Sequence, residues 1–259
     1  MNSQERKMLD LLKELKEDYG VYGIKAEFEA EGARTDELIS LRELVLKADL
    51  KFVIKIGGCE AVHDLLQCKI LGATGIMAPM IETPFAMSKF VGAAKRVYAE
   101  DINQIEWIIN AETKTCHANY KEILAEGKDF LKAVTVGRSD LSASMGIARA
   151  DIETKPVYDA TRHLLEMSRE AGFKTNFGGN IGIETIPFIQ GLSDVTDRFE
   201  TRKVIVSIDN DAEHLKKAIS KALEFEYQYL LNKKDYYSRI AVEDEKRIER
   251  MLNQINKVQ

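Results

Sequence analysis

The chain has 259 residues, of which 45% are hydrophobic, and its formal net charge is −5 at pH 7. This length suits one large α/β domain, and the hydrophobic content is enough for an ordinary core. The acidic balance argues against a nucleic-acid or anionic-membrane partner. No apolar run reaches the roughly 18 residues that a membrane span needs, and the polar start of the chain is unlike a signal peptide.

The cysteines and histidines give no sign of a zinc site or a disulfide framework. Cys59, Cys68 and Cys116 are odd in number and lack CxxC spacing, and the histidines are scattered along the chain. We therefore expect reduced thiols, a cytoplasmic protein and no zinc.

Short apolar segments alternate with amphipathic helical segments along the chain. Strands are predicted at 23–29, 51–56, 75–81, 105–111, 133–136, 174–177 and 203–208. Helices are predicted at 35–48, 60–72, 83–99, 116–128 and 157–172. Such alternation predicts a parallel sheet covered by helices, and the chain length is typical of an eight-stranded (β/α) barrel.

Two features of this architecture stay open in the sequence. The eighth strand is expected either near the N-terminus or within 190–200, and a doubly wound open sheet is the alternative fold, although no GxGxxG motif supports it. Residues 209–259 predict a helical hairpin whose second helix could pack on a neighbouring subunit. We expect residues 1–259 to form a single barrel domain with this helical extension.

Polar residues follow most of the predicted strands, where a barrel has its active site. They are Glu27, Glu29, Glu31, Lys55, Glu82, Glu112, Arg138, Ser139, Asp140, Asn176, Ser207 and Asp209. Carboxylates gathered on one rim repel each other unless protons or a cation lie among them. An all-oxygen ligand set favours Mg²⁺ or Mn²⁺ over zinc. Glu112 and Asp140, which follow consecutive strands, are the predicted metal ligands.

Simpler interpretations exist for some of these residues. Asp140 could be a helix N-cap, and Glu27 and Glu29 could lie on the solvated face of an edge strand. Lys55 is harder to explain in this way, because a strand buried on both faces should be continuously apolar. A lysine at that position needs acidic partners.

Three segments resemble the HpcH/HpaI aldolase and citrate lyase β-subunit family. "VTVGRSDLSASMG" (134–146) is similar to its "GPxDLSxSxG" signature, "IINAET" (108–113) to its strand ending in a metal-binding glutamate, and "GIMAPMIET" (75–83) to its "GVMVPMVET" strand. The resemblance runs from about residue 23 to residue 150. It implies a (β/α)8 TIM barrel of the pyruvate/phosphoenolpyruvate-binding type. It also implies a divalent-metal lyase or aldolase that acts on oxoacids or acyl-CoA esters.

Roles for individual residues follow from this resemblance. Glu112 and Asp140 would bind Mg²⁺ or Mn²⁺, and Lys55 would replace an arginine that contacts the substrate. Gly137, Arg138, Ser139 and Glu82 would line the substrate site, with the backbone amides of 137–140 holding a carboxylate. The family's histidine is absent, since Ala30 stands in its place, and Arg138 stands where the family has proline.

The predicted function is a metal-dependent carbon–carbon lyase or aldolase acting on a 2-oxoacid through a pyruvate-type enolate. Lys55 would stabilise the enolate oxygen, Glu27 or Glu29 would move protons, and Arg138 would hold an anionic second substrate. The alternatives are a Schiff-base aldolase that uses Lys55, and a catalytically altered barrel that serves as a binding subunit. The resemblance also implies a homo-oligomer, either a trimer or a hexamer.

Overall fold

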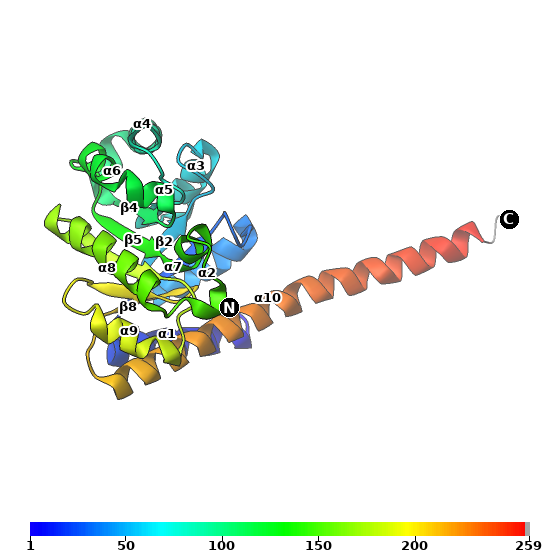
Figure 1. Ribbon diagram of the computed structural model, residues 1–259. Helices are drawn as coiled ribbons and strands as arrows, with labels where there is room; N and C mark the ends of the chain where they lie inside the picture. Colours follow the sequence, from blue (N-terminus) through cyan, green and yellow to red (C-terminus); the bar gives the residue numbers. More distant parts are fainter. Residues whose placement is uncertain (257–259) are drawn as a thin grey trace.

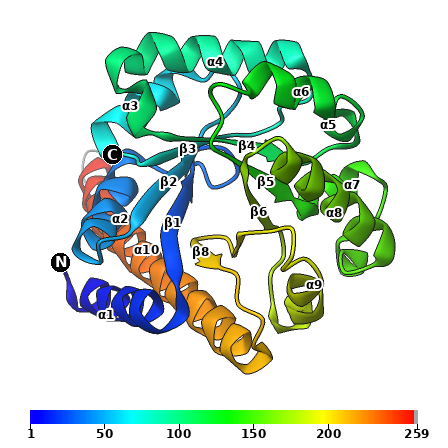
Figure 2. The ribbon, with the colours of Figure 1, turned by 90° about the vertical axis from the view of Figure 1, so that its left-hand side faces the viewer.

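The computed structural model, which describes residues 1–256, shows a closed barrel of eight strands surrounded by helices (Figures 1 and 2). The strands follow one another around the barrel in chain order. They are β1 (Val21–Glu27), β2 (Lys51–Lys55), β3 (Gly75–Ala78), β4 (Glu106–Ala111), β5 (Ala133–Gly137), β6 (Lys174–Gly178), β7 (Arg198–Glu200) and β8 (Val204–Ser207). The predicted alternation and the barrel are therefore confirmed.

Helices connect the strands on the outside of the barrel. The α-helices are α1 (Ser3–Tyr19), α2 (Thr35–Lys47), α3 (Val62–Leu71), α4 (Pro84–Tyr98), α5 (Lys114–Ala118), α6 (Tyr120–Gly127), α7 (Arg138–Ser144), α8 (Lys155–Glu170), α9 (Ile186–Gly191) and α10 (Ala212–Ile255). Short 3₁₀ helices lie at Ala99–Gln104, Arg149–Asp151 and Ile183–Thr185. Gly20, which ends α1, adopts φ 62°, a left-handed conformation that favours glycine at a helix end.

The last two strands depart from the regular barrel pattern. Neighbouring strands from β1 to β7 pair in parallel, whereas β8 runs antiparallel to both β7 and β1. The eighth strand is thus β7, within the predicted 190–200 interval, and the N-terminal segment forms a helix instead. Because β8 runs backwards, Ser207 and Asp209 lie at the opposite end of the barrel from the other strand ends. Their predicted place on the functional rim is wrong.

We call the carboxyl ends of β1–β7 the mouth of the barrel and the opposite end its floor. Side chains at the floor fill the barrel with apolar atoms from Val53, Met77, Ile108, Ala133 and Ile205. Below them, the Tyr22 hydroxyl donates to Glu106 at 2.7 Å, and Arg198 pairs with Glu106 at 3.0 Å. The floor is therefore closed, and the polar residues nearer the mouth are reached from the mouth.

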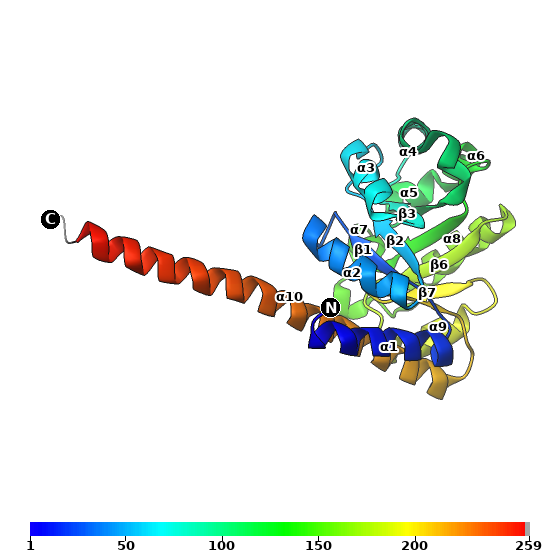
Figure 3. The same ribbon diagram turned by 180° about the vertical axis from the view of Figure 1, so that it is seen from behind.

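The C-terminal segment is one continuous helix, α10, so the predicted helical hairpin is wrong. No glycine or proline interrupts residues 212–255, and the Asp211 side chain caps the helix start by accepting from the His214 backbone at 2.7 Å. The first half packs against α1 and the barrel, while the second half extends away from the barrel (Figures 1 and 3). None of the helices within residues 1–256 is long and apolar enough to span a membrane.

Candidate active site

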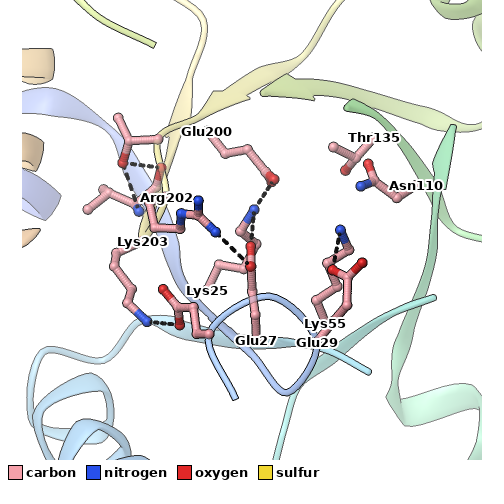
Figure 4. A network of polar contacts seen from close by, with 12 residues as sticks. Lys25, Glu27, Glu29, Lys55, Asn110, Thr135, Glu200, Arg202 and Lys203 are labelled. Atoms are coloured by element: carbon pink, nitrogen blue, oxygen red, sulfur yellow. Dashed lines mark hydrogen bonds and ion pairs between the residues drawn. The ribbon is translucent and has the colours of Figure 1, made fainter. Parts of the chain in front are cut away.

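Charged side chains from several strands meet inside the mouth half of the barrel (Figure 4). Side chains alternate along a strand, so Lys25 and Glu27 on β1 point inward, as does Lys55 on β2. All three are buried. Because the barrel is closed, β1 is not an edge strand, and the solvated-face interpretation of Glu27 is wrong.

One group, the Lys25 cluster, consists of Lys25, Glu27, Glu200 and Arg202. The Lys25 ammonium lies 2.5 Å from Glu200 Oε1 and 3.1 Å from Glu27 Oε1, and Arg202 Nη1 lies 3.1 Å from Glu27 Oε2. Burial disfavours the charged form of Glu27, but Lys25 and Arg202 outweigh burial and lower its pKa. Glu27 is thus held as a carboxylate between two cations.

The other group, the Lys55 cluster, consists of Lys55, Glu29 and Glu112. Lys55 Nζ lies 2.8 Å from Glu29 Oε2 and 3.4 Å from Glu112 Oε2. Burial opposes the charge on Lys55, but Glu112 and Glu29 outweigh it, so the pKa of Lys55 is raised. The acidic partners that the sequence required for Lys55 are therefore present, and the lysine remains an ammonium ion.

Glu112 is the most deeply buried carboxylate of the Lys55 cluster, with a side chain only 1% exposed. Its Oε1 accepts the Met80 backbone N–H at 3.0 Å, and its Oε2 accepts from the Asn110 amide. Burial raises the pKa of Glu112 to about 7; Lys55 and the Met80 N–H oppose the rise, while Asp140 adds to it. More negative charge gathers around Glu112 than one lysine balances.

The backbone around Glu112 is shaped to fit its carboxylate. Met80 adopts φ 51°, an uncommon conformation for a residue with a side chain, and donates its N–H to Glu112 from there. A Cβ at Gly137 would lie 2.8 Å from Glu112 Oε2 and 3.0 Å from Asn110 Nδ2. Glycine is therefore required at the end of β5 for Glu112 to occupy its position.

Asp140 lies on α7 and is exposed. Gly137 occupies the N-cap position of α7 and no side chain caps this helix, so the N-cap interpretation of Asp140 is wrong. Asp140 is near enough to Glu112 for its charge to raise the pKa of that carboxyl group. Within residues 1–256 no three His, Cys, Asp or Glu side chains form a metal cluster. Glu112 and Asp140 still match Mg²⁺, which takes one or two carboxylates and fills its other positions with water or substrate.

The Arg138 side chain does not face this site, and this position differs from the one that its predicted role in substrate binding requires. Its side chain is completely buried, and its nitrogens bond to Glu153 at 3.0 Å and to the carbonyls of Gly178 and Gly179 at 3.3 and 2.7 Å. The guanidinium carbon also lies 4.3 Å from the centre of the Phe188 ring. These contacts use the donors that a substrate would need, so Arg138 fixes the loop after β6.

Glu82 and Ser139 lie beside the site and brace its loops. Glu82 Oε1 accepts from the Thr113 hydroxyl at 2.7 Å, directly after Glu112 in the chain. Ser139 packs against Gly179, where a Cβ would lie 2.6 Å from the Ser139 backbone nitrogen. Their direct contact with a substrate stays a prediction, as does that of Gly137.

Several polar residues of the barrel were missed by the sequence reasoning: Lys25, Asn110, Thr135, Glu200 and Arg202. Lys25 stands two residues before Glu27, and Asn110 two before Glu112, so alternation along the strand would have found both. Thr135 and Glu200 join the network through Asn176, whose amide donates to them at 3.1 and 2.6 Å. Glu200 and Arg202 escaped because β7 is too short to produce a strand pattern.

Comparisons with known proteins identify the family and the fold of this chain. A family model described as HpcH/HpaI aldolase/citrate lyase matches residues 33–177, which is more than half of the chain. The chain belongs to the HpcH/HpaI aldolase/citrate lyase family. Membership supports a lyase or aldolase activity for this HpcH/HpaI protein. The match contains Lys55, Glu82, Glu112 and the segment 137–140, whereas Glu27, Glu29, Glu200 and Arg202 lie outside it.

Solved structures share the fold of this HpcH/HpaI protein. A family member from Burkholderia cenocepacia J2315 has a TM-score of 0.57 and 18% identity over 83% of this chain and 98% of that one. The HpcH/HpaI aldolase from Desulfitobacterium hafniense DCB-2 has a TM-score of 0.61 and 16% identity over 86% and 88% of the two chains. A citrate synthase variant has a TM-score of 0.54 and 17% identity over 84% and 98%. A sequence comparison with curated proteins finds no match.

Proposed function

We propose that this protein is a divalent-metal-dependent carbon–carbon lyase or aldolase that acts on a 2-oxoacid through a pyruvate-type enolate. The proposal is supported by family membership. It depends above all on one observation: buried Glu112 faces Lys55 inside the mouth, with the Asp140 charge nearby. This arrangement combines an acidic ligand set with a fixed positive charge.

Glu112 and Asp140 would hold Mg²⁺ or Mn²⁺, and the remaining positions would be left to water and substrate. When bound, the ion would supply Lewis-acid stabilisation to the oxo and carboxylate oxygens of the substrate. Gly137 and Met80 keep the Glu112 carboxylate in one position, so this ligand is ordered before any ion arrives.

Lys55 would place its ammonium group where negative charge develops on the enolate oxygen. Glu29 is the better placed of the two predicted proton-transfer acids, because its side chain is 27% exposed and contacts Lys55 directly. Lys25 and Arg202 hold Glu27 as a carboxylate. Glu27 is therefore better suited to orienting neighbouring side chains than to transferring protons.

Exchange of the pyruvate methyl protons with D₂O, followed by proton NMR, tests the proposal directly because exchange requires the enolate. We expect exchange with Mg²⁺ or Mn²⁺ and none with EDTA. Lys55→Met should slow exchange by about 100-fold or more, as expected for loss of a charge aimed at the reacting oxygen. Lys155→Met, which changes an exposed lysine of α8, is the control and should exchange normally. Absence of exchange with either metal would contradict the proposal and favour the binding-subunit alternative.

The Schiff-base alternative depends on the same lysine. A Schiff-base lysine must be deprotonated to attack a ketone, whereas Glu112 and Glu29 raise the pKa of Lys55. Borohydride added with pyruvate should therefore leave Lys55 unlabelled in a mass spectrum of the protein. A reduced pyruvyl adduct on Lys55 would establish the Schiff-base mechanism instead.

We expect the protein to form a homo-oligomer, either a trimer or a hexamer, through the distal half of α10. Large hydrophobic side chains are exposed along it, including Ile240, Ile248, Met251, Leu252 and Ile255. An isolated helix depends on packing of its apolar face for most of its stability. Light scattering should show an oligomer for the wild type and a dissociated protein for the double variant Ile248→Glu, Leu252→Glu. An unchanged mass in the variant would contradict assembly through α10.

The proposed location is the cytoplasm, consistent with three unpaired cysteines.

A further inference from the structure

Two histidines lie side by side on the outside of the barrel. The ring centres of His117 on α5 and His163 on α8 are 5.2 Å apart, with an angle of 48° between the ring planes. His117 is half-buried and His163 is exposed. The two residues belong to different helices, so no spacing motif marks them in the sequence and only folding brings them together.

Both imidazole rings are available to a metal ion. Among the side chains of residues 1–256, neither ring has a hydrogen-bond or ion-pair partner, in contrast to His214, which lies 4.0 Å from Asp209. Burial and the neighbouring His163 lower the pKa of His117, so its ring is neutral at pH 7. A neutral imidazole is the form that binds a metal ion.

The distance between the two rings matches a pair of imidazoles on one ion. Zn–N bonds of about 2.0–2.1 Å at a tetrahedral angle place the centres of two imidazole ligands about 5 Å apart. Imidazole nitrogen suits Zn²⁺, Cu²⁺ and Ni²⁺, whereas carboxylate oxygen suits Mg²⁺ and Mn²⁺. No third His, Cys, Asp or Glu completes a cluster in the described part of the chain, so water would fill the other positions.

The histidine pair joins helices that lie next to the proposed active site. Helix α5 begins two residues after Glu112, and α8 packs against α7, which carries Asp140. The Lys114 N–H at the start of α5 donates to the Ser144 hydroxyl at the end of α7 at 3.0 Å. Figure 2 shows α5, α7 and α8 on the same side of the barrel. An ion between the two rings would therefore brace the elements that follow both predicted Mg²⁺ ligands.

We propose that His117 and His163 form a second metal site, which binds a borderline transition-metal ion such as Zn²⁺. This site goes beyond the proposed function, because it lies outside the barrel, uses nitrogen ligands and takes no part in the reaction. The bound ion would stabilise the folded protein, because the unfolded chain does not hold the two rings together.

Cu²⁺ is the probe that identifies the ligands, because its EPR spectrum shows coupling to bound nitrogen atoms. The full chain without an affinity tag, carrying Glu112→Gln to weaken the mouth site, should bind one Cu²⁺ with a two-nitrogen pattern. Adding His117→Gln or His163→Gln should remove this pattern and weaken Cu²⁺ binding by about tenfold or more. His63→Gln, which changes a histidine of α3, is the control and should leave the spectrum unchanged.

Thermal unfolding with Zn²⁺ provides a second measurement. Zn²⁺ at about 100 times its dissociation constant should raise the unfolding temperature of the Glu112→Gln protein by about 3 °C or more. Adding His117→Gln or His163→Gln should abolish this rise, whereas His63→Gln should retain it. The unfolding temperature without Zn²⁺ shows whether each variant is folded.

The outcomes separate this site from the proposed function. A Cu²⁺ spectrum without nitrogen coupling, or a spectrum that both histidine variants leave unchanged, overturns the histidine site and leaves the proposed function standing. If the enolate exchange assay fails while the two-nitrogen pattern and the Zn²⁺ shift are observed, the proposed function fails and the histidine site stands.

Discussion

The Lys25 cluster and the Lys55 cluster occupy the same barrel and are both buried, yet their charges are balanced differently. Lys25 and Arg202 together hold Glu27 as a carboxylate with a lowered pKa. Glu112 in the Lys55 cluster has one lysine at 3.4 Å, and its pKa rises to about 7. Glu112 is the more deeply buried of the two carboxylates and has fewer cations close to it, and these two causes together explain the difference in pKa. The Lys55 cluster, which has less positive charge than the Lys25 cluster, is the one suited to receive a metal cation.

Removal of each lysine should reveal this difference most strongly. Lys25→Met leaves Glu27 and Glu200 buried without their shared cation, and should lower the free energy of unfolding by about 3–5 kcal/mol. Lys55→Met should cost less, about 1–3 kcal/mol, because Glu29 is partly exposed and Glu112 can take up a proton. Urea unfolding of both variants at pH 7 measures the two values. Equal losses would show that the clusters do not differ in charge balance.

The fit of the backbone around Glu112 gives the next largest effect. Gly137→Ala would place a methyl group 2.8 Å from Glu112 Oε2, and should lower stability by about 1–3 kcal/mol and proton exchange by about tenfold or more. Gly92→Ala is the matched control, because nothing lies within 4 Å of its added Cβ in α4. Thermal unfolding and the exchange assay measure both changes. If Gly137→Ala behaves like Gly92→Ala, Gly137 does not shape the site.

The smallest effect concerns acid stability and the Lys25 cluster. The pKa of Glu27 is lower in the folded protein than its ordinary value of 4.5, so its contribution to stability is complete above that value. That contribution is lost as the pH falls through the lowered pKa of the folded state. The free energy of unfolding should therefore fall less steeply with acid in Glu27→Gln than in the wild type between pH 5 and pH 3. Parallel pH profiles for the two proteins would contradict the assigned shift.

The barrel and the need of Lys55 for acidic partners were predictable because both depend on local patterns. Strand–helix alternation fixes the architecture, and a lysine inside a buried strand demands acidic partners. The direction of β8 was not predictable in this way. "KVIVSI" has the same apolar pattern whether the strand runs toward the mouth or away from it, and only closure of the barrel decides.

The failures at Arg138 and in the C-terminal segment have similar physical causes. An arginine after a strand could face the mouth or turn back under the next loop; the carbonyls of Gly178 and Gly179, 40 and 41 residues away in sequence, decide its direction. Residues 209–259 were predicted to form two helices. Without glycine or proline, however, the chain has no local reason to leave the helix.

Mn²⁺ binding, followed by the EPR signal of the free ion, tests most directly whether Glu112 and Asp140 hold one divalent cation at the mouth. We expect one Mn²⁺ per chain in the wild type and at least about tenfold weaker binding in Glu112→Gln and in Asp140→Asn. Asp209→Asn, at the floor of the barrel, should bind Mn²⁺ like the wild type. Wild-type affinity in both mouth variants would contradict the metal site.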